Sequence, residues 1–134
     1  MKLSTRARYG LRLAFIIGIA GEKTVSLSTL VKQTDLSEKY LEQLLIMLRK
    51  GNVVTSVRGT NGGYNLSRPA SEITIKEILV SLNDAFDITD CADGKCKDAY
   101  CPNKIIFKRL YDGIDGLLSG TTLEDMIKDY RCVR

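Results

Sequence analysis

Three of the four cysteines lie close together in one short segment, CADGKCKDAYC. Four residues separate Cys91 from Cys96, and four separate Cys96 from Cys101. In a reducing compartment such a group of thiols is more typical of a metal site or a redox switch than of a structural disulfide. Thiolates are soft ligands that suit an iron-sulfur cluster or a zinc ion. The spacing therefore predicts a functional thiol site, and it allows an iron-sulfur cluster, a zinc ion or a disulfide switch.

A metal centre on this triplet needs a fourth ligand, because three thiolates are one short of the usual set. Cys132 is the chemically obvious candidate, although it lies far along the chain and equally fits an ordinary thiol near the chain end. The expected cofactor is an iron-sulfur cluster with two or four irons. Its predicted ligands are Cys91, Cys96, Cys101 and Cys132.

The residue types needed for much enzyme chemistry are missing. The chain has no histidine, which excludes serine-histidine catalysis, cysteine-histidine catalysis and His-ligated metals within it. It also lacks a Walker phosphate loop, a dinucleotide-binding fingerprint and a nucleophile elbow. We therefore expect a binding protein and not an enzyme.

The stretch from Ser37 to Tyr64 has the pattern of a DNA-binding motif. Its first half has leucines at helical spacing, which predicts a half-buried helix with Ser37 as N-cap and Gly51 as C-cap. A β-branched run at 53–57, a glycine-rich turn at 58–63 and a second short strand follow. This order predicts a winged helix-turn-helix, whose helix enters the major groove while the hairpin reaches the minor groove.

The predicted recognition helix has one apolar and one polar face. The apolar face consists of Leu41, Leu44, Leu45 and Leu48. The polar face consists of Glu38, Lys39, Glu42, Gln43 and Arg49. Because Arg58 lies in the following glycine-rich turn, we expect it on the wing.

The net charge of +4 is unevenly distributed along the chain. Residues 1–70 carry 11 Lys and Arg against 4 Asp and Glu, a net charge of +7, whereas residues 71–134 carry 9 against 12, a net charge of −3. The positive charge coincides with the predicted motif, as expected for a surface that displaces counterions from a duplex. Motif and charge together predict double-stranded DNA as the partner.

Two helices precede the recognition helix. Apolar residues between Ser4 and Gly21 follow helical spacing, with Ser4 as N-cap and Gly21 as the stop. This spacing favours an amphipathic first helix over a signal peptide, and the apolar run is too short to span a membrane. We therefore expect a cytoplasmic protein. A second short helix after Ser26 completes the helix-turn-helix.

Three helices are expected after the wing. A capping box at Thr74 and Glu77 opens a helix, a loop follows at 84–100, and the next helix starts at Cys101 and Pro102. A further capping box from Thr121 to Glu124 opens the last helix. The inward residues of the first of these helices are Ile75, Ile78, Leu79 and Leu82.

The helix after Pro102 has an apolar stripe formed by Ile106, Leu110, Ile114, Leu117 and Leu118. This stripe packs either on its own domain or on a symmetry mate. A single winged helix reads few base pairs, so we predict a dimerisation helix and a homodimer on a palindromic operator.

The expected fold class is mainly α with a small β-hairpin wing, that is, a winged helix-turn-helix plus a long C-terminal dimerisation helix. The expected divisions are the DNA-binding domain at 1–83, the cysteine-bearing sensor loop at 84–101, and the dimerisation and C-terminal helices at 102–134.

These motifs resemble those of the Rrf family of bacterial winged-helix regulators over nearly the whole chain. The matching segments are 2–5, 8–10, 36–37, 40–44, 48–50, 56–59, 62–64 and 121–125. The resemblance implies a homodimer held by the long helix and matches the cysteine triplet to the cluster ligands of the family. It also places Tyr40, Glu42 and Gln43 near the bases. With the wing, the predicted DNA-binding residues are Ser37, Lys39, Tyr40, Glu42, Gln43, Arg49, Ser56, Arg58 and Gly59.

The function expected from motifs and resemblance is a homodimeric DNA-binding transcription regulator. It senses iron-sulfur, redox or nitric oxide status through a cysteine-ligated iron-sulfur cluster. Two positions that supply a fourth ligand in family members hold Lys104 and Arg8 here, which leaves Cys132, a loop aspartate or an exogenous ligand. The alternative is a cluster-free repressor of cysteine or sulfur metabolism, controlled by thiol oxidation, a metabolite or a partner. A DNA-independent metal carrier is disfavoured by the basic motif.

Overall fold

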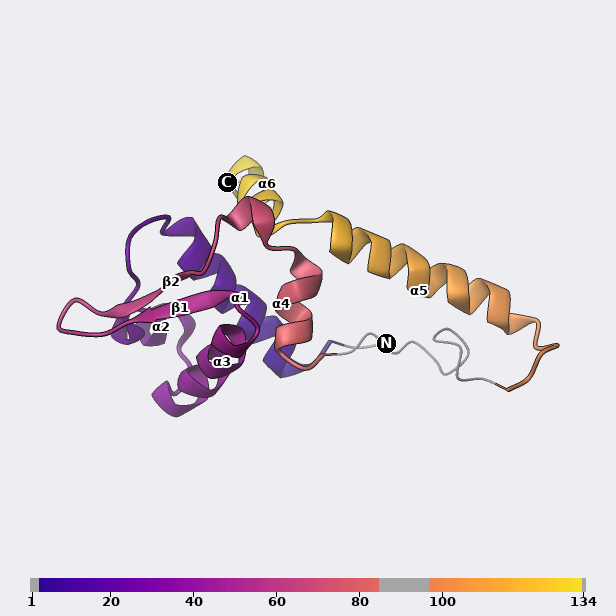
Figure 1. The fold of residues 1–134 in the computed structure, drawn as a ribbon, viewed down its shortest axis with the longest axis horizontal. Coiled ribbons are helices and arrows are strands. Elements are labelled where there is room, and N and C mark those ends of the chain that lie inside the picture. Colours follow the sequence, from indigo (N-terminus) through magenta and orange to yellow (C-terminus); the bar gives the residue numbers. More distant parts are fainter. Residues whose placement is uncertain (1–2, 85–96, 134) are drawn as a thin grey trace.

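The computed structural model describes residues 3–84 and 97–133, which fold into helices and one β-hairpin (Figure 1). The helices are α1 (Thr5–Ile19), α2 (Leu27–Thr34), α3 (Glu38–Lys50), α4 (Ile75–Ser81), α5 (Asn103–Gly120) and α6 (Leu123–Val133), with a short 3-10 helix η1 (Ala70–Glu72) before α4. The antiparallel strands are β1 (Val54–Val57) and β2 (Gly63–Leu66). The predicted fold class, mainly α with a small hairpin wing, is confirmed.

Local sequence signals start the first three helices. Ser4, Ser26 and Ser37 occupy the N-caps of α1, α2 and α3, and each side-chain oxygen accepts a hydrogen bond from the amide three residues further on. An N-cap serine satisfies an amide that the first turn leaves unpaired, so the helix begins at that residue. Gly51 is the C-cap of α3. These four predicted helix limits are confirmed.

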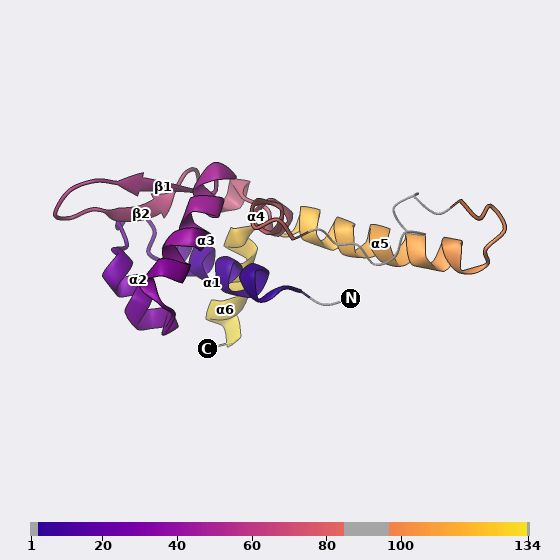
Figure 2. The same ribbon diagram turned by 90° about the horizontal axis from the view of Figure 1, so that it is seen from below.

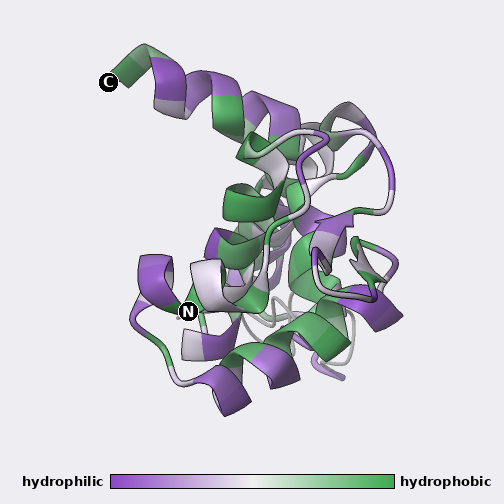
Figure 3. Ribbon diagram, turned by 90° about the vertical axis from the view of Figure 1, so that its left-hand side faces the viewer, coloured by the Kyte–Doolittle hydropathy of each residue, from purple (hydrophilic) through white to green (hydrophobic). Residues whose placement is uncertain are grey.

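The hydrophobic core joins α1, α3, α4 and α6. The predicted inward residues of α3 and α4 are all buried: Leu41, Leu44, Leu45, Leu48, Ile75, Ile78, Leu79 and Leu82. Hydrophobic and hydrophilic segments alternate along the helices (Figure 3), as expected for elements that bury one face. In α6, Leu123 and Ile127 are buried, and side-chain atoms of both lie within 3.2 Å of a Cβ placed at Gly18 of α1. The missing side chain at Gly18 therefore lets α6 pack closely on α1.

The start of α6 differs from the prediction by one residue. The sequence predicts a capping box at Thr121 and Glu124. It is formed instead by Thr122 and Asp125, since the Thr122 amide donates to the Asp125 carboxylate (2.9 Å) and the Asp125 amide donates to the Thr122 hydroxyl (3.1 Å). Thr121 is extended, and its carbonyl accepts from the amide of Ile75 (2.9 Å). This tertiary bond delays the helix by one residue, so the predicted register of the box is wrong.

The cap of α6 leads to a pH-dependent prediction. The hydrogen bond from the Thr122 amide holds the pKa of Asp125 below its ordinary value of 3.8, and Lys128 adds a smaller effect of the same sign. Because the folded-state pKa is lowered, the carboxylate stabilises the fold above the unfolded-state pKa, and this contribution is lost as the pH falls through the folded-state pKa. We expect Asp125→Asn to lower the melting temperature at neutral pH, and the difference to shrink as the pH falls below 3.8 and to vanish once Asp125 is protonated in the folded state.

Thermal unfolding followed by circular dichroism measures this difference across the pH range. Asp129→Asn is the matched control, because it removes the same charge from the exposed side of α6 and leaves the capping box intact. It should change the melting temperature little at any pH. A destabilisation by Asp125→Asn of equal size at every pH would contradict the assigned cap.

α5 extends away from the rest of the molecule (Figures 1 and 2). It begins at Asn103, with Pro102 as the N-cap, so the start predicted at Cys101 and Pro102 is slightly early. One side of α5 faces α4, where Lys76 and Asp115 form an ion pair of 2.6 Å. No residue of this fully described helix is buried.

The predicted apolar stripe of α5 is divided between two faces. Leu118 packs against the core, and Ile114 is partly buried. Ile106, Leu110 and Leu117 are 56%, 48% and 68% exposed, respectively. A row of exposed apolar side chains of this kind is expected where another chain packs. Among the described residues, no helix is long and apolar enough to cross a membrane.

Candidate nucleic-acid interface and cysteine site

α2 and α3 are joined by a turn that side-chain and backbone bonds hold in place. Asp35 ends α2 in a left-handed conformation (φ 57°), and its amide donates to the carbonyl of Val31 (3.0 Å). Thr34 is buried, and its hydroxyl donates to the Leu30 carbonyl (2.7 Å) and accepts from the Leu36 amide (3.4 Å). Thr34 therefore helps to set the angle between the two helices, a role that the sequence analysis missed.

The outer face of α3 presents most of the predicted base-reading and phosphate-binding side chains to solvent. The predicted DNA-binding residues Lys39, Glu42, Gln43 and Arg49 are all exposed on this face, as is Glu38. Ser37 is exposed as well, and its hydroxyl accepts from the amide of Tyr40 (3.2 Å), so it is engaged as the N-cap. Lys39, Glu42 and Gln43 are therefore available to a ligand, whereas Arg49 is hydrogen-bonded to Ser56 and Ser37 has a structural role in the free protein.

Tyr40 is anchored by a contact with α1. It is partly buried, and its ring packs edge-on against Tyr9, with a centroid separation of 6.3 Å and an interplanar angle of 87°. Edge-to-face packing restricts the orientation of both rings. Tyr9 thus positions a predicted DNA-binding residue. In the sequence, Tyr9 is distinguished only by its place in segment 8–10, which resembles the family.

The wing is a hairpin with a thin, glycine-rich tip. At its outer end Val57 pairs with Gly63. Gly59 has a φ of 112°, a conformation that favours glycine, and a Cβ at Gly62 would lie 2.3 Å from the carbonyl oxygen of Val57. Arg58 is exposed on this turn. The two glycines therefore permit a narrow turn that carries one cationic side chain.

The hairpin is braced by the segment before α2. Val25 and Tyr64 exchange two backbone hydrogen bonds of 3.0 and 2.9 Å. A Cβ at Gly63 would lie 2.2 Å from the carbonyl oxygen of Val25, so only glycine permits this approach. The role of Val25 was not predicted from the sequence, although the consecutive glycines at 62 and 63 signal a close backbone approach.

α3 and the wing meet beside an open hollow. Arg49 donates from Nη1 to Oγ of Ser56 (3.3 Å), which links α3 to β1. The adjacent hollow has a volume of about 340 Å³, and Arg49, Ser56, Arg58 and Gly59 contribute to its lining. The fold thus brings together four predicted DNA-binding residues from two elements. Two arginines at one hollow suit a phosphate or another anion.

The two described cysteines do not come together within the chain. Cys101 is partly exposed and directly precedes α5, whereas Cys132 is exposed on the last turn of α6. Between them in the chain lie all of α5, whose 18 residues span about 27 Å at 1.5 Å per residue, and most of α6. Cys91 and Cys96 lie outside the described residues. In residues 3–84 and 97–133, no three potential metal ligands are grouped.

The described aspartates on either side of the cysteine segment have other partners. The Asp84 carboxylate accepts from the amide (3.3 Å) and the hydroxyl (3.4 Å) of Ser4, which ties it to the start of α1. The Asp98 carboxylate accepts from the amide of Tyr100 (3.0 Å). Both carboxylates therefore already accept hydrogen bonds from other residues of the chain.

The chain matches known proteins over nearly its whole length. The model of the Rrf2 family, described as an iron-dependent transcriptional regulator, matches residues 3–129. The HTH-type transcriptional regulator IscR of Photorhabdus laumondii is 33% identical over 132 residues, which cover 96% of this chain and 80% of the relative.

Two solved structures extend the similarity to the fold. The structure of CymR, the global cysteine regulator of B. subtilis, has a TM-score of 0.82 and 33% identity, and the match covers 96% of this chain and 97% of that chain. The structure of T. potens IscR has a TM-score of 0.78 and 34% identity, with 97% and 88% covered. The matching family and these relatives are transcriptional regulators, so the prediction that the chain is not an enzyme is confirmed.

Proposed function

Because the chain belongs to the Rrf2 family of DNA-binding transcriptional regulators, we propose that it acts as a homodimer on a palindromic operator and senses iron-sulfur, redox or nitric oxide status through its cysteine triplet. The observation that carries the DNA-reading part is the meeting of α3 and the wing at one hollow with two arginines. A regulator of this kind acts on the chromosome, so we also propose a cytoplasmic location.

In the proposed complex, α3 lies in the major groove. Glu42 accepts a hydrogen bond from a cytosine amino group, and Gln43 pairs with an adenine edge, as these side chains do in direct readout. Lys39 binds a phosphate. Tyr40 lies beside the base-reading surface, where its contact with Tyr9 of α1 holds it. Ser37, the N-cap of α3, holds the first turn of this helix next to the sugar-phosphate backbone of the duplex.

The wing makes the second part of the proposed contact. Arg58 enters the minor groove, where arginine is attracted by the negative potential. Ser56 and Gly59 line the approach, and Arg49 binds the phosphate between the two grooves. The hollow between α3 and β1 is then occupied by one strand of the duplex.

The proposed dimer contact is the outward face of α5. Ile106, Leu110 and Leu117 are about half or more exposed there, and a second copy of the same helix covers them in an isologous twofold contact. Gly113 lies between Leu110 and Leu117 along the helix, and no described atom comes within 4 Å of a Cβ placed at it. Two helices can therefore approach closely at this position.

The described residues do not by themselves form the metal site. Cys101 is the member of the triplet that the structure describes, and the cluster proposal is supported by the even spacing in the sequence and by the resemblance to cluster-binding family members. Cys91, Cys96 and Cys101 would hold the cluster. When bound, the cluster supplies a centre that reacts with oxidants or nitric oxide.

The second candidate is a cluster-free regulator of cysteine or sulfur metabolism, controlled by thiol oxidation, a metabolite or a partner. Two observations favour it. Cys101 precedes α5 whereas Cys132 lies on the last turn of α6, so the two cysteines belong to different parts of the described fold. The similarity to CymR, the global cysteine regulator, also covers 96% of the chain.

Anaerobic purification separates the two candidates. We expect the purified protein to contain iron and acid-labile sulfide in matching amounts and to show thiolate-to-iron charge-transfer absorption. The triple variant Cys91→Ser/Cys96→Ser/Cys101→Ser should lose all three signals, and the matched control Cys132→Ser should keep them. Loss of the cluster should also change the affinity for a duplex selected from a random-sequence library.

Three results decide against the cluster. One is iron-free, colourless protein even after reconstitution. Another is cluster loading in the triple variant. The third is unchanged affinity and site choice when the cluster is removed. Thiol titration after mild oxidation then tests the alternative, because a disulfide switch loses free thiols without any metal.

A further inference from the structure

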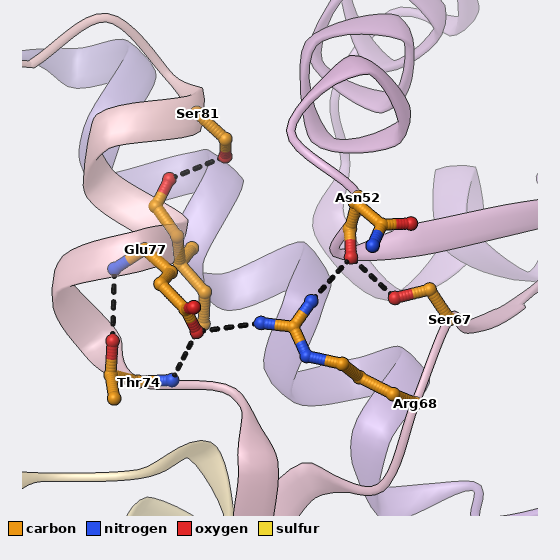
Figure 4. Close-up of polar contacts among 7 residues, drawn as sticks. Asn52, Ser67, Arg68, Thr74, Glu77 and Ser81 are labelled. Atoms are coloured by element: carbon orange, nitrogen blue, oxygen red, sulfur yellow. Dashed lines mark hydrogen bonds and ion pairs between the residues drawn. The ribbon is translucent and has the colours of Figure 1, made fainter.

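One arginine outside the predicted DNA-binding set joins three parts of the molecule (Figure 4). Arg68 follows the end of β2, at the base of the wing. Its Nη1 donates to the carbonyl oxygen of Asn52 (2.9 Å), and its Nη2 donates to Oε2 of Glu77 (2.7 Å). The Arg68 side chain is 25% exposed. Charge-assisted hydrogen bonds are among the stronger hydrogen bonds in proteins, and both of these lie near the surface, where the Glu77 side chain is 46% exposed.

The first acceptor lies in the turn between α3 and β1. Asn52 has a φ of 59°, so the chain reverses sharply directly after the recognition helix. Its carbonyl also accepts a hydrogen bond from the Ser67 hydroxyl, and the Ser67 amide donates to the carbonyl of Val53 (3.0 Å). The turn that sets the angle between α3 and the wing is therefore held from the β2 side by Ser67 and Arg68.

The second acceptor belongs to the capping box of α4. Glu77 accepts at the same Oε2 from the amide of Thr74 (2.9 Å), and its own amide donates to the Thr74 hydroxyl (3.1 Å). The first turn of α4 is thus connected through Arg68 to the turn after α3. A second contact lies one helical turn further, where a Cβ at Gly51 would come within 2.2 Å of Cβ of Ser81.

The other end of α4 is also tied to the body of the protein. Arg6 of α1 donates from Nε to the carbonyl of Leu82 (2.6 Å) and from Nη2 to that of Asn83 (3.2 Å). α4 is therefore held at both ends, and Arg68 is a polar link from α4 to the DNA-reading elements, beside the close packing of Gly51 on Ser81.

We propose that Arg68 is a positioning residue for the DNA-reading surface, which sets the orientation of the wing relative to α3 and couples both to α4. It acts through Asn52 and Glu77 and does not contact DNA. The inference rests on the proposed DNA binding, because its functional consequence is sequence discrimination. A lysine at this position keeps the charge but lacks the planar fork that spans two acceptors.

The test compares variants on a duplex selected from a random-sequence library by the unsubstituted protein and on a scrambled duplex. Arg68→Ala should weaken binding to the selected duplex about tenfold, as expected for the loss of hydrogen bonds to a charged group, and should change binding to the scrambled duplex by less than about threefold. The salt dependence should stay the same, since no phosphate contact is lost. Arg68→Lys should show most of the same loss.

Lys76→Ala is the matched control, because it also removes a cation, from the first turn of α4, and breaks the ion pair with Asp115 without touching the link to the wing. It should leave the ratio of the two affinities unchanged. Glu77→Gln is the second variant if Arg68→Ala fails to fold, since it keeps the arginine and weakens the same link. It should lower the ratio in the same direction.

Amide hydrogen exchange tests the link without DNA. Exchange at Val53 to Val57 and at Ser67 should be about tenfold faster in Arg68→Ala and Glu77→Gln, and unchanged in Lys76→Ala.

The outcomes also separate this proposal from the proposed function. If the unsubstituted protein selects no DNA sequence, the proposed DNA binding fails, and hydrogen exchange alone tests whether Arg68 connects the wing to α4. An equal loss on both duplexes with a salt slope lower by about one would identify Arg68 as a phosphate contact and overturn the proposal. An unchanged affinity ratio would overturn it as well.

Discussion

A protein carrying Leu110→Glu and Leu117→Glu is expected to be a folded monomer that binds its selected palindromic duplex about 100-fold more weakly than the unsubstituted protein. Both leucines lie on the outward face of α5, where they are 48% and 68% exposed. Carboxylates at these positions stay hydrated in a monomer, so the fold loses little stability. In the proposed dimer the same carboxylates would be buried without partners, which opposes association.

The loss of affinity follows from the linkage of two reading heads, each of which consists of α3 and the wing of one chain. When one head of a dimer is bound, the other is held close to its half-site, and this raises the effective concentration for the second contact. A monomer lacks this advantage even if α3 and the wing are intact. Sedimentation equilibrium measures the association state, and fluorescence anisotropy measures the affinity for the duplex.

Val133→Glu provides the matched control for these substitutions. Val133 is an apolar residue of α6 that is 89% exposed. Its substitution by glutamate adds the same charge per site as each leucine substitution, but outside the outward face of α5. This variant should remain dimeric and bind normally. A doubly substituted protein that still sediments as a dimer would show that the outward face of α5 is not the interface.

Arg58→Ala is expected to weaken binding to the selected duplex about 10- to 100-fold and to reduce the salt slope by about one. Arg58 is exposed on the tip of the wing, beside a glycine with a φ of 112°. It lines the same hollow as Arg49 of α3. Removal of its charge should therefore abolish a groove contact, and one fewer counterion should be released from the duplex on binding. The melting temperature should not change, because the side chain is exposed.

Arg131→Ala is the control for the wing variant, since Arg131 is equally cationic and is exposed on α6. It lowers the net charge by the same amount, so any general effect of charge appears in both variants. Binding assays over a range of salt concentrations separate the local from the general effect. Equal losses in the two variants would mean that the wing makes no specific contact.

The two predictions separate association from reading. The substitutions on α5 should leave the weak binding of each head to short half-site duplexes intact, whereas Arg58→Ala should reduce binding to half-site and full-length duplexes alike. This comparison also shows whether a variant at Arg68 acts within one head, as its contacts with Asn52 and Glu77 require.

Features that depend on close neighbours in the chain were predictable from the sequence. The N-cap serines at 4, 26 and 37, the capping box of Thr74 and Glu77, and the glycine-rich tip of the wing all follow rules that span about four residues. The leucine spacing of α3 predicted its buried face for the same reason. Recognition helix and wing, the core of the candidate site, therefore needed no tertiary information.

Features that depend on contacts between distant segments were not predictable in this way. Periodicity shows that α5 has an apolar stripe, but only packing assigns Leu118 to the core and Leu117 to the outward face. The start of α6 moves by one residue because Thr121 bonds to Ile75, which is 46 residues earlier in the chain. The three-way link through Arg68 likewise joins residues that are 16 and 9 positions away.

The cysteines illustrate the same distinction. Their number and even spacing define the chemistry that the chain can offer, because thiolate reactivity is a property of the residue type. Whether two thiols can share a ligand depends on the distance between them in space. The length of α5 separates Cys101 from Cys132, a consequence of a helix that projects from the body. Residue types thus determined the possible chemistry, and the packing of distant segments determined which residues meet, because side-chain contacts across the chain form only when all helices are in place.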